Sequence, residues 1–433
     1  MRRLIILLVS SSLAILIIWG IVGLLRQANT PTAQASVQFA PQSASQFAPL
    51  PNHPSLAPDA GLPAPRITTT TLLDFFQPGT QPNQITDTID APQQCMGCHE
   101  GYSNQIDQPA DYEPWTGWAG SMMAQSGRDP IFYAALDIAN ADAAFAGEFC
   151  LRCHLPRGWL DGRSTPTDGS AMTPIDQEGI QCEVCHRAVD PIYSGENPAR
   201  DLTVLAAITS PVIMPGNAGL IVDTADFRRG PFDVVADNGF DPHNPAAGAL
   251  DTLQSPFHQE AALCGSCHDI SNPLLSWDEP SQSYTLNPSN QPFTDTTALF
   301  PIERTYSEWL LSDFNTPQGV VLPQFGGNKS AVSTCQDCHM QDVTGVGASF
   351  FGSVGNIPER NDLPQHDLTG ANNWVPLIIP QMPAFSATFS TEPFAAERLA
   401  ALYAGADRAT AMLQNAAELD ISLSGTQLMV TIT

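Results

Sequence analysis

The cysteines constrain this chain more than any other feature of its sequence. All ten fall into Cys-x-x-Cys pairs, and a histidine directly follows the second cysteine of each pair. The motifs, numbered 1 to 5 along the chain, are Cys95-Cys98-His99, Cys150-Cys153-His154, Cys182-Cys185-His186, Cys264-Cys267-His268 and Cys335-Cys338-His339. Cys-x-x-Cys-His is the attachment signature of c-type haem. The sequence therefore predicts haem c as cofactor, five per chain.

The spacing within each motif suits this chemistry. Residues i and i+3 share one face of a helix, so the two thiols of a motif can add to the two vinyl groups along one porphyrin edge. The next residue then directs its imidazole at the iron as the proximal axial ligand. Each haem also adds a large apolar surface, so a chain rich in loops can still form a dense interior.

Three other roles for the cysteines fit less well. Disulfides occur in exported proteins, but they do not require a histidine after every second cysteine. Structural zinc normally uses two such pairs for each ion, and five is an odd number of pairs. A thioredoxin-like redox motif would occur once, in an α/β context. Haem attachment is the interpretation that explains every motif.

The remaining histidines are the first candidates for distal axial ligands. His53 falls in a segment that we interpret as a tether, whereas His243, His258 and His366 could each bind an iron or lie on the surface. Methionine is the other usual axial ligand, so Met122 and Met123 are candidates too, with packing against porphyrin as the alternative. Three candidate histidines cannot supply a distal ligand to all five haems. We therefore expect at least one haem to be five-coordinate, to have a methionine ligand, or to take its ligand from residues missing from this chain.

The charge of the chain bears on its partners. Acidic residues outnumber basic ones by 44 to 17, and Lys329 is the only lysine. Phosphate binding needs clusters of Lys and Arg, which argues against nucleic acid. The excess of acidic residues either keeps the surface well solvated or provides a docking surface for a basic redox partner protein. The net charge alone does not distinguish these two roles. Arg228 and Arg229 are candidates to neutralise haem propionates.

The N-terminus has the pattern of an export signal. Arg2 and Arg3 precede an apolar run from Leu4 to Leu25, whose 22 residues match the roughly 20 that span a bilayer. This favours an uncleaved signal anchor at residues 1–26, and a small-x-small site at Ala33-Gln34-Ala35 leaves a cleaved signal peptide as the alternative. Both place the protein outside the cytoplasm, in the periplasm or on the outer face of the membrane.

The rest of the chain divides by composition. Residues 27–90 are rich in Pro, Gln and Ala and predict a disordered tether. Residues 91–390 form the predicted pentahaem domain, in which loops alternate with short helices such as 129–146 and 306–314. A helix is expected over 391–418, capped by Thr391. Residues 419–433 alternate strictly around a turn at Ser424-Gly425, which predicts a β-hairpin and the start of a further, truncated β domain.

Several short sequence segments between the motifs resemble those of a known family, over residues 94–375. They are Trp118-Ala-Gly-Ser-Met-Met-Ala, Arg128-Asp-Pro, Gly158-Trp-Leu-Asp-Gly-Arg, Thr305-Tyr-Ser-Glu-Trp and His366-Asp-Leu-Thr-Gly, together with the residues within and around motifs 2 to 5. The chain thus resembles multihaem c-type cytochromes related to the tetrahaem electron carrier of nitrifiers and to hydroxylamine oxidoreductase. The resemblance implies a mostly α and irregular fold organised by stacked c-haems, continuing into a β-sandwich.

Three functions compete at this point. Electron transfer along five irons is the leading hypothesis. The second is an oxidoreductase that acts on a small nitrogen or sulfur species at an open iron, for which the sequence locates no catalytic residue. Pentahaem nitrite reductases also have five haems, but their Cys-x-x-Cys-Lys site is absent here. The third is a structural role in an oligomer or polymer, against which the predicted membrane anchor argues.

Overall fold

The computed structural model describes residues 70–244, 250–290, 298–350, 352–355, 357–382 and 395–432. All of these belong to one structural unit, Ala57–Thr433. The predicted signal anchor, His53 and the first part of the predicted tether lie outside the described residues. No helix within them combines the length and the apolar composition that crossing a bilayer requires.

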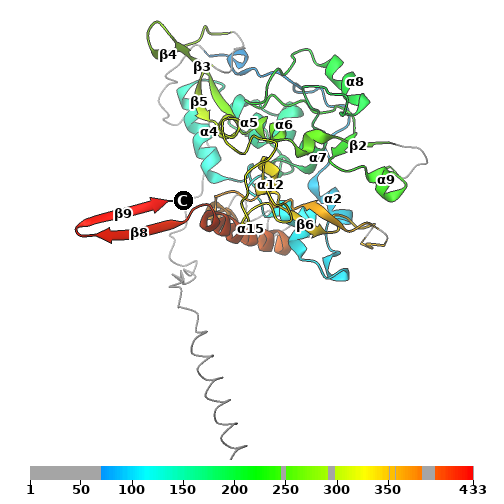
Figure 1. The fold of residues 1–433 in the computed structure, drawn as a ribbon. Coiled ribbons are helices and arrows are strands. Elements are labelled where there is room, and N and C mark those ends of the chain that lie inside the picture. Colours follow the sequence, from blue (N-terminus) through cyan, green and yellow to red (C-terminus); the bar gives the residue numbers. More distant parts are fainter. Residues whose placement is uncertain are drawn as a thin grey trace, which may run out of the picture. The chain divides into compact units, whose positions relative to one another are not determined.

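Most helices are short (Figure 1). The α-helices are α2 (Pro92–His99), α3 (Pro114–Ala119), α4 (Pro130–Asp142), α5 (Gly147–His154), α6 (Pro156–Leu160), α7 (Cys182–His186), α8 (Ala199–Ala207), α9 (Val234–Asn238), α10 (Ala261–Gly265), α11 (Thr305–Leu310), α12 (Cys335–His339), α13 (Val375–Ile378) and α15 (Ala395–Asn415). Proline at the first turn starts α2, α3, α4 and α6, where its missing N–H is not needed.

Single turns of 3-10 helix connect these elements. They are η2 (Leu72–Phe75), η3 (Ser103–Gln105), η4 (Ala110–Tyr112), η5 (Asp176–Glu178), η6 (Pro256–Gln259) and η7 (Ile379–Gln381). The predicted helix over 129–146 corresponds to α4, which Asp129 caps through Ile131 N–H. The predicted helices over 306–314 and 391–418 correspond to α11 and α15, and the caps proposed for the latter lie outside the described residues.

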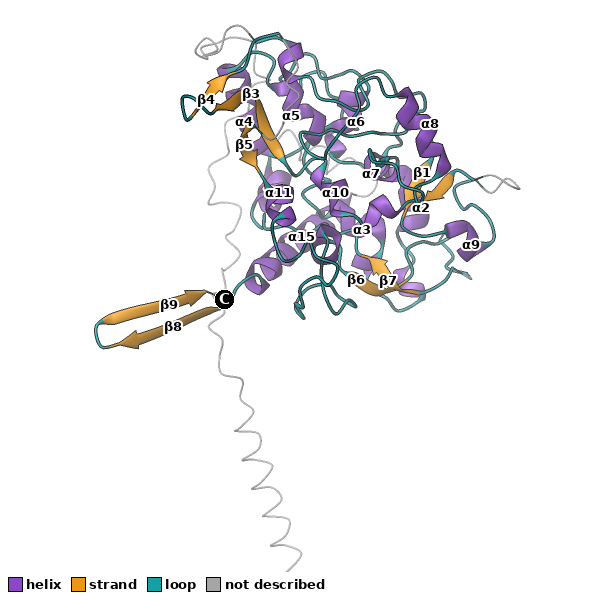
Figure 2. Ribbon diagram, turned by 45° about the horizontal axis from the view of Figure 1, so that its top comes forward, coloured by secondary structure: helices purple, strands orange, loops and turns teal. Residues whose placement is uncertain are grey.

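The strands form small sheets (Figure 2). Strands β1 (Arg228–Gly230) and β2 (Thr252–Gln254) are parallel, β3 (Ile270–Asp278) lies between β4 (Ser283–Leu286) and β5 (Leu299–Glu303), and β6 (Asp342–Gly345) pairs with β7 (Arg360–Pro364). The described part therefore mixes helix and sheet more evenly than the mostly α fold that the resemblance implies. Its organisation by haems stays a prediction.

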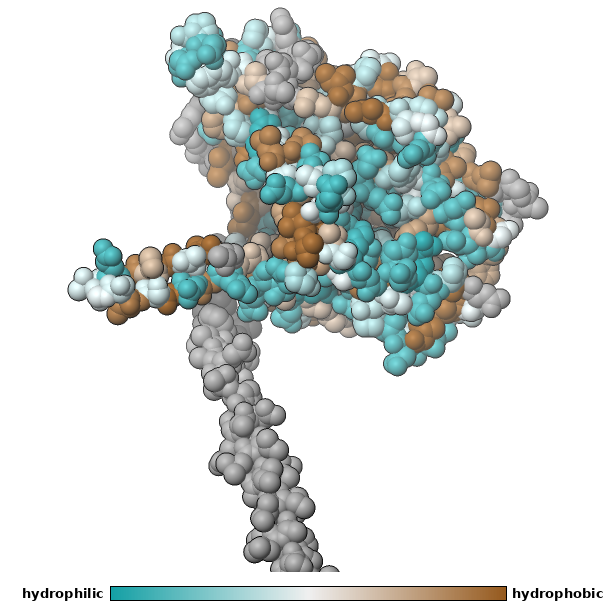
Figure 3. Space-filling model, in the orientation of Figure 1, coloured by the Kyte–Doolittle hydropathy of each residue, from teal (hydrophilic) through white to brown (hydrophobic). Residues whose placement is uncertain are grey.

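The predicted hairpin is present as β8 (Leu419–Ser424) and β9 (Gln427–Ile432). The pairing of Ser424 with Gln427 places the two-residue turn at Gly425 and Thr426, one residue later than predicted. Gly425 has a positive φ of 62°, which glycine adopts without a steric penalty. The apolar side chains that alternate along both strands are exposed, and they are visible along the hairpin in Figure 3. The predicted β-sandwich stays a prediction.

Part of the predicted tether is packed, which corrects its boundary. Phe75 and Ile89 are buried, and the Thr80 hydroxyl donates to Val222 O (3.1 Å) while it accepts from Val222 N–H (2.9 Å). Composition misled the prediction because residues 70–90 contain few apolar side chains. Two of those few enter clusters supplied by distant segments, Ile89 by α4 to α7 and Phe75 by β3.

The apolar interior is divided. Among the described residues, buried apolar side chains form six separate clusters, the largest of which joins α4, α5, α6 and α7. Helix α15 packs closely on the end of α3 at Gly405 and Gly120. A Cβ atom at Gly405 would lie 1.9 Å from Gly120 O, so this close approach requires glycine. A domain of this size normally builds one continuous core. The divided interior is what we expect if other groups fill the space between clusters.

Candidate haem-binding sites

Each attachment motif begins on a short helix of its own. Motifs 1 and 2 occupy the ends of α2 and α5, motifs 3 and 5 make up α7 and α12, and motif 4 begins on α10, which ends at Gly265, two residues before Cys267. All ten cysteines are partly buried and none forms a disulfide. The helical turn brings each cysteine pair to one face, as the sequence predicts for thioether attachment.

Backbone carbonyls orient three of the motif histidines. The Nδ1 atom of His99 lies 2.9 Å from Gly347 O, that of His186 lies 2.7 Å from Arg229 O, and that of His339 lies 2.6 Å from Thr369 O. A carbonyl oxygen only accepts, so Nδ1 must carry the proton and Nε2 keeps its free lone pair. This is the tautomer that a metal-binding imidazole needs, held by a fixed partner.

Two distal candidates are fixed in the same tautomer. His366 Nδ1 lies 3.0 Å from Pro364 O. His243 Nδ1 lies 2.8 Å from Thr252 Oγ1, and that hydroxyl already donates its proton to Asp241 Oδ1 (2.8 Å). The imidazole of His243 must therefore be the donor. Both residues keep Nε2 available to an iron.

The distal candidates face motif histidines. The ring centroids of His99 and His243 are 6.3 Å apart with planes inclined by 20°, and those of His186 and His366 are 6.1 Å apart with planes inclined by 19°. Two imidazoles that bind one metal ion from opposite sides have centroids about 6 Å apart, because each metal–nitrogen bond is about 2 Å long. The structure thus brings together two pairs with the separation of coaxial ligands.

His258 also approaches His186, with a centroid separation of 5.6 Å. Its Nε2 lies 2.9 Å from Cys185 O, so Nε2 is the donor and Nδ1 is the atom with the free lone pair. Nδ1 is buried and has no hydrogen-bond partner. The tautomer of His258 is therefore the opposite of that in His366, although both rings lie beside motif 3.

Motifs 2 and 4 have different surroundings. The Phe132 ring stacks on the His154 imidazole, with centroids 4.0 Å apart and planes inclined by 11°. This contact covers one face of the imidazole ring. Within the described residues, no second histidine ring is stacked on His154, His268 or His339.

The imidazoles have the protonation state and the environment of metal ligands. Burial lowers the pKa of His366 to about 3 and that of His154 to about 4, and it also lowers the pKa values of His99 and His186. All are therefore neutral near pH 7, which is the form that binds metal. These residues are nevertheless only partly buried as a whole. Side chains that lie deep in a molecule and still have surface are typical of residues that line an internal space, so the donor set fits haem.

The arginines proposed to meet haem propionates are occupied by protein carboxylates. Arg229 is fully buried and pairs with Asp201 (2.8 Å) and Asp223 (2.8 Å). Arg228 contacts Glu183 (2.5 Å), Asp90 and Asp226. These carboxylates neutralise the two cations, the acidic trio around Arg228 is explained by the guanidinium at its centre, and a role toward propionates stays a prediction.

The methionine candidates lie in packing environments. Met122 packs against the cluster of Val375, Ile379 and Leu402. The carbonyl of Met123 accepts from Ile180 N–H (3.0 Å). Packing is thus the observed role of Met122, and ligation by either residue stays a prediction.

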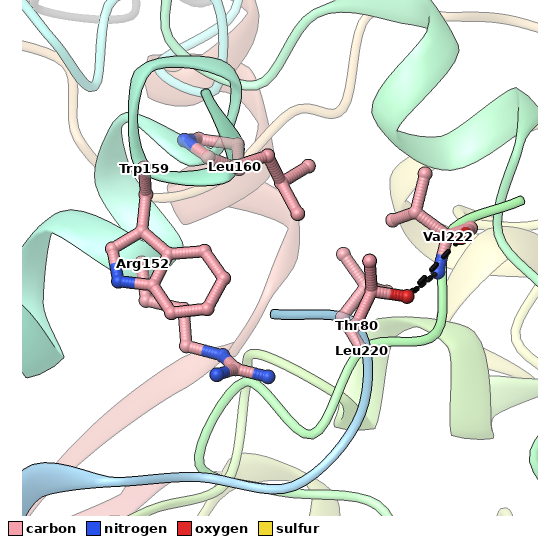
Figure 4. A pocket seen from close by; sticks show the side chains of 7 residues that line it. Thr80, Arg152, Trp159, Leu160, Leu220 and Val222 are labelled. Carbon is pink, nitrogen blue, oxygen red and sulfur yellow. Dashed lines mark hydrogen bonds between the residues drawn. The ribbon is translucent and has the colours of Figure 1, made fainter. Parts of the chain in front are cut away.

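A small pocket near motif 2 is lined by Thr80, Arg152, Trp159, Leu160, Leu220 and Val222 together with Pro156 (Figure 4). The Arg152 guanidinium lies 4.2 Å from the Trp159 ring centroid and donates to Ala218 O (2.6 Å) and Gln77 O (3.1 Å). These N–H groups of Arg152 donate to backbone carbonyls and not to a group in the pocket. Arg152 therefore ties motif 2 to its neighbours and leaves the pocket without a charged recognition group.

Sequence reasoning missed the groups that support the imidazoles. Gly347, Arg229 and Thr369 act through backbone carbonyls, which every residue type possesses. Phe132 was read only as part of a helix. The spacing of Phe132 gives no signal of its contact with His154, because 22 residues and a helix end separate them.

No family model, curated protein or solved structure matches this chain.

Proposed function

We propose that this protein transfers electrons outside the cytoplasm through five covalently bound c-type haems. One observation carries the proposal. All five Cys-x-x-Cys-His motifs begin on separate short helices of one unit, and three of the five histidines are held with Nε2 free by a backbone carbonyl. A disulfide framework has no use for this orientation, and the odd number of cysteine pairs argues against structural zinc.

In this proposal, each type of residue in the motifs and around them has its own role. The paired thiols attach the cofactor, the motif histidines bind the iron, and the carbonyls fix the imidazole tautomer. His243 and His366 supply the opposite ligands to motifs 1 and 3. When bound, each haem supplies a one-electron couple, and its potential depends on ligand type and burial. Closing two irons with histidine on both sides favours carrying electrons over binding substrate.

Location and partners follow from the termini and the charge. Residues 1–26 anchor the chain in the membrane, and the net charge of −27 steers a basic redox protein toward it. Deleting residues 4–25 should leave a cytoplasmic chain without covalent haem, because attachment takes place after export. A haem-loaded cytoplasmic product would contradict the proposed location.

The central test is haem stoichiometry. Expressed with a haem-maturation system, the protein should show five haem additions by mass spectrometry, and a reductant should reduce all five in a visible titration. Replacing Cys335 and Cys338 by serine is the matched control, since it should remove one haem and leave the others. Fewer than five additions in the parent protein would overturn the proposal.

A second candidate function rests on a specific observation. Among the described residues no second histidine ring stacks on His154, His268 or His339, so an iron at motif 2, 4 or 5 could remain open to a small nitrogen or sulfur species. Electron paramagnetic resonance of the oxidised protein would show an open ferric haem as a high-spin signal. Turnover of nitrite or hydroxylamine by that haem would favour an oxidoreductase, whereas uniformly low-spin haems that ignore carbon monoxide would exclude it.

A further inference from the structure

The motifs are not neighbours in the order of the sequence. The thiols of Cys95 and Cys182 lie within hydrogen-bonding range of each other, which joins motif 1 to motif 3. Asp90 N–H, just before α2, donates to Glu183 Oε2 of α7 (2.8 Å). Motifs 1 and 3 are thus in direct contact although motif 2 lies between them in the sequence.

Motif 3 in turn contacts motif 4. His258 lies six residues before Cys264, and its Nε2 donates to Cys185 O at 2.9 Å. The thiols of Cys264 and Cys267 both lie close enough to Cys185 to interact with it. A hydrogen bond and the proximity of the thiols therefore connect these motifs.

Motif 2 meets motif 4 from another side. The thiols of Cys153 and Cys267 are within hydrogen-bonding range. The backbone supports this contact, because Arg152 Nε donates to Ala218 O (2.6 Å) while the adjoining Asn217 N–H donates to Asp269 O (2.9 Å). Asp269 directly follows the motif histidine His268.

Motif 5 also meets motif 4. The thiols of Cys264 and Cys335 are within hydrogen-bonding range. Gln336, inside motif 5, donates through Nε2 to Glu260 O (2.8 Å), the residue before α10. Motif 4 is thus in contact with motifs 2, 3 and 5.

Each motif thiol marks one edge of a porphyrin, because the thioether bond joins that cysteine to a vinyl group on the ring edge. We propose that motif 4 is the junction of a branched electron path, in which motif 1 leads through motif 3 to motif 4, and motifs 2 and 5 are separate branches. The inference rests on the proposed function. At each step one electron passes from a reduced iron to an oxidised one, no bond is made or broken, and one-electron redox proteins are donor and acceptor.

One further contact joins motif 2 and motif 3 and could be mistaken for a direct electron path between them. Leu151 of motif 2 and Val184 of motif 3 belong to the same apolar cluster. Each lies between the two cysteines of its motif, so it is on a different side of the helix from the thiols. Cys150 of motif 2 also packs against this cluster, whereas among the described residues no cysteine of motif 3 does, so the cluster does not bring a thiol of motif 2 to a thiol of motif 3. The branched path has three ends, at motifs 1, 2 and 5.

The test removes the junction and compares that variant with removal of one end. Cys264→Ser combined with Cys267→Ser removes the haem of motif 4, and Cys335→Ser combined with Cys338→Ser removes that of motif 5. Paramagnetic resonance detects magnetic coupling between adjacent ferric haems. Loss of the junction should leave motifs 2 and 5 uncoupled while motifs 1 and 3 stay coupled, whereas loss of motif 5 should leave the other contacts intact. Continued coupling of motif 2 to motif 3 without motif 4 would overturn the inference.

A measurement on the unaltered protein covers the case in which the junction variant does not fold. Exchange NMR of partly reduced protein assigns the shift in potential that each haem imposes on each other haem. The motif 4 haem should interact strongly with three others and the motif 1 haem with one. A linear pattern in sequence order would overturn the junction alone, provided that mass spectrometry confirms five haems. A deficit of haem would instead overturn the proposed function.

Discussion

The surroundings of motifs 1 and 3 differ from those of motif 2 in what restrains the imidazole. At motifs 1 and 3 the Nδ1 atoms are held by carbonyls, and His243 and His366 lie opposite the rings. At motif 2 the Nδ1 atom of His154 is buried without a hydrogen-bond partner, and Phe132 covers the ring face. The first region is arranged around paired imidazoles and the second around apolar packing.

This difference teaches that the five sites need not have one role. Paired imidazoles close an iron on both sides and give it a low potential relative to methionine ligation. A histidine held by packing alone leaves the opposite side of its iron to other groups. We expect the region of motifs 1 and 3 to respond to changes in ligands, and the region of motif 2 to respond to changes in packing and pH.

The largest effect should follow from removing an opposite imidazole. His243→Ala or His366→Ala should each convert one low-spin haem to high-spin, because the iron of motif 1 or motif 3 becomes five-coordinate. The measurement is paramagnetic resonance of the oxidised protein, with haem content checked by mass spectrometry. His53→Ala is the control and should change no spin state. Unchanged low-spin signals in both variants would show that the pairing is wrong.

The packing of motif 2 offers the next test. Phe132 is 6% exposed, and Phe132→Ala should lower the free energy of unfolding by about 3 kcal/mol, since it leaves a cavity against His154 and α4. Ile131, the neighbouring residue, is 51% exposed, so Ile131→Ala should cost well under about 1 kcal/mol. Denaturant unfolding of both variants with full haem content checks this. Equal losses would mean that the stack on His154 adds nothing.

We expect low pH to destabilise the fold of the loop that connects motif 2 to motif 3. Burial alone would raise the pKa of Asp176, but hydrogen bonds from Arg163 and Thr173 hold it below its ordinary value. A carboxylate with a lowered pKa stabilises the fold above its unfolded pKa of about 4, and this contribution is lost as the pH falls below that value.

Asp176→Asn should therefore reduce stability at pH 7 by about 2 kcal/mol and flatten the loss of stability below about pH 4. Thermal unfolding across pH measures both effects. Asp168, which is exposed, provides the matched control as Asp168→Asn, and its pH profile should follow that of the parent protein. An Asp176→Asn variant that keeps the parent's acid sensitivity would show that other carboxylates set it.

The spacing of each cysteine pair predicted that both thiols share one face of a helical turn, because that relation is local, and haem attachment at these residues stays a prediction. The sequence also identified His243 and His366 as distal candidates, but not which motif each one faces. That pairing depends on tertiary contacts between segments more than 100 residues apart. The alternation of β8 and β9 was visible because a period of two is local. The packing of residues 70–90 was missed because distant segments supply the partners of Phe75 and Ile89.

The smallest effect is expected from His258, and it decides which ring serves motif 3. His186 has two neighbouring imidazoles, and one iron takes a single ligand opposite His186. His366 keeps Nε2 free, whereas the Nε2 of His258 is spent on Cys185 O. His258→Ala should therefore preserve the low-spin state of that haem and only shift its potential, because a hydrogen bond to the backbone of motif 3 is lost. Potentiometric titration with paramagnetic resonance separates these outcomes. A high-spin haem in His258→Ala together with an unchanged spectrum in His366→Ala would exchange the two assignments and leave the pairing of His99 with His243 untouched.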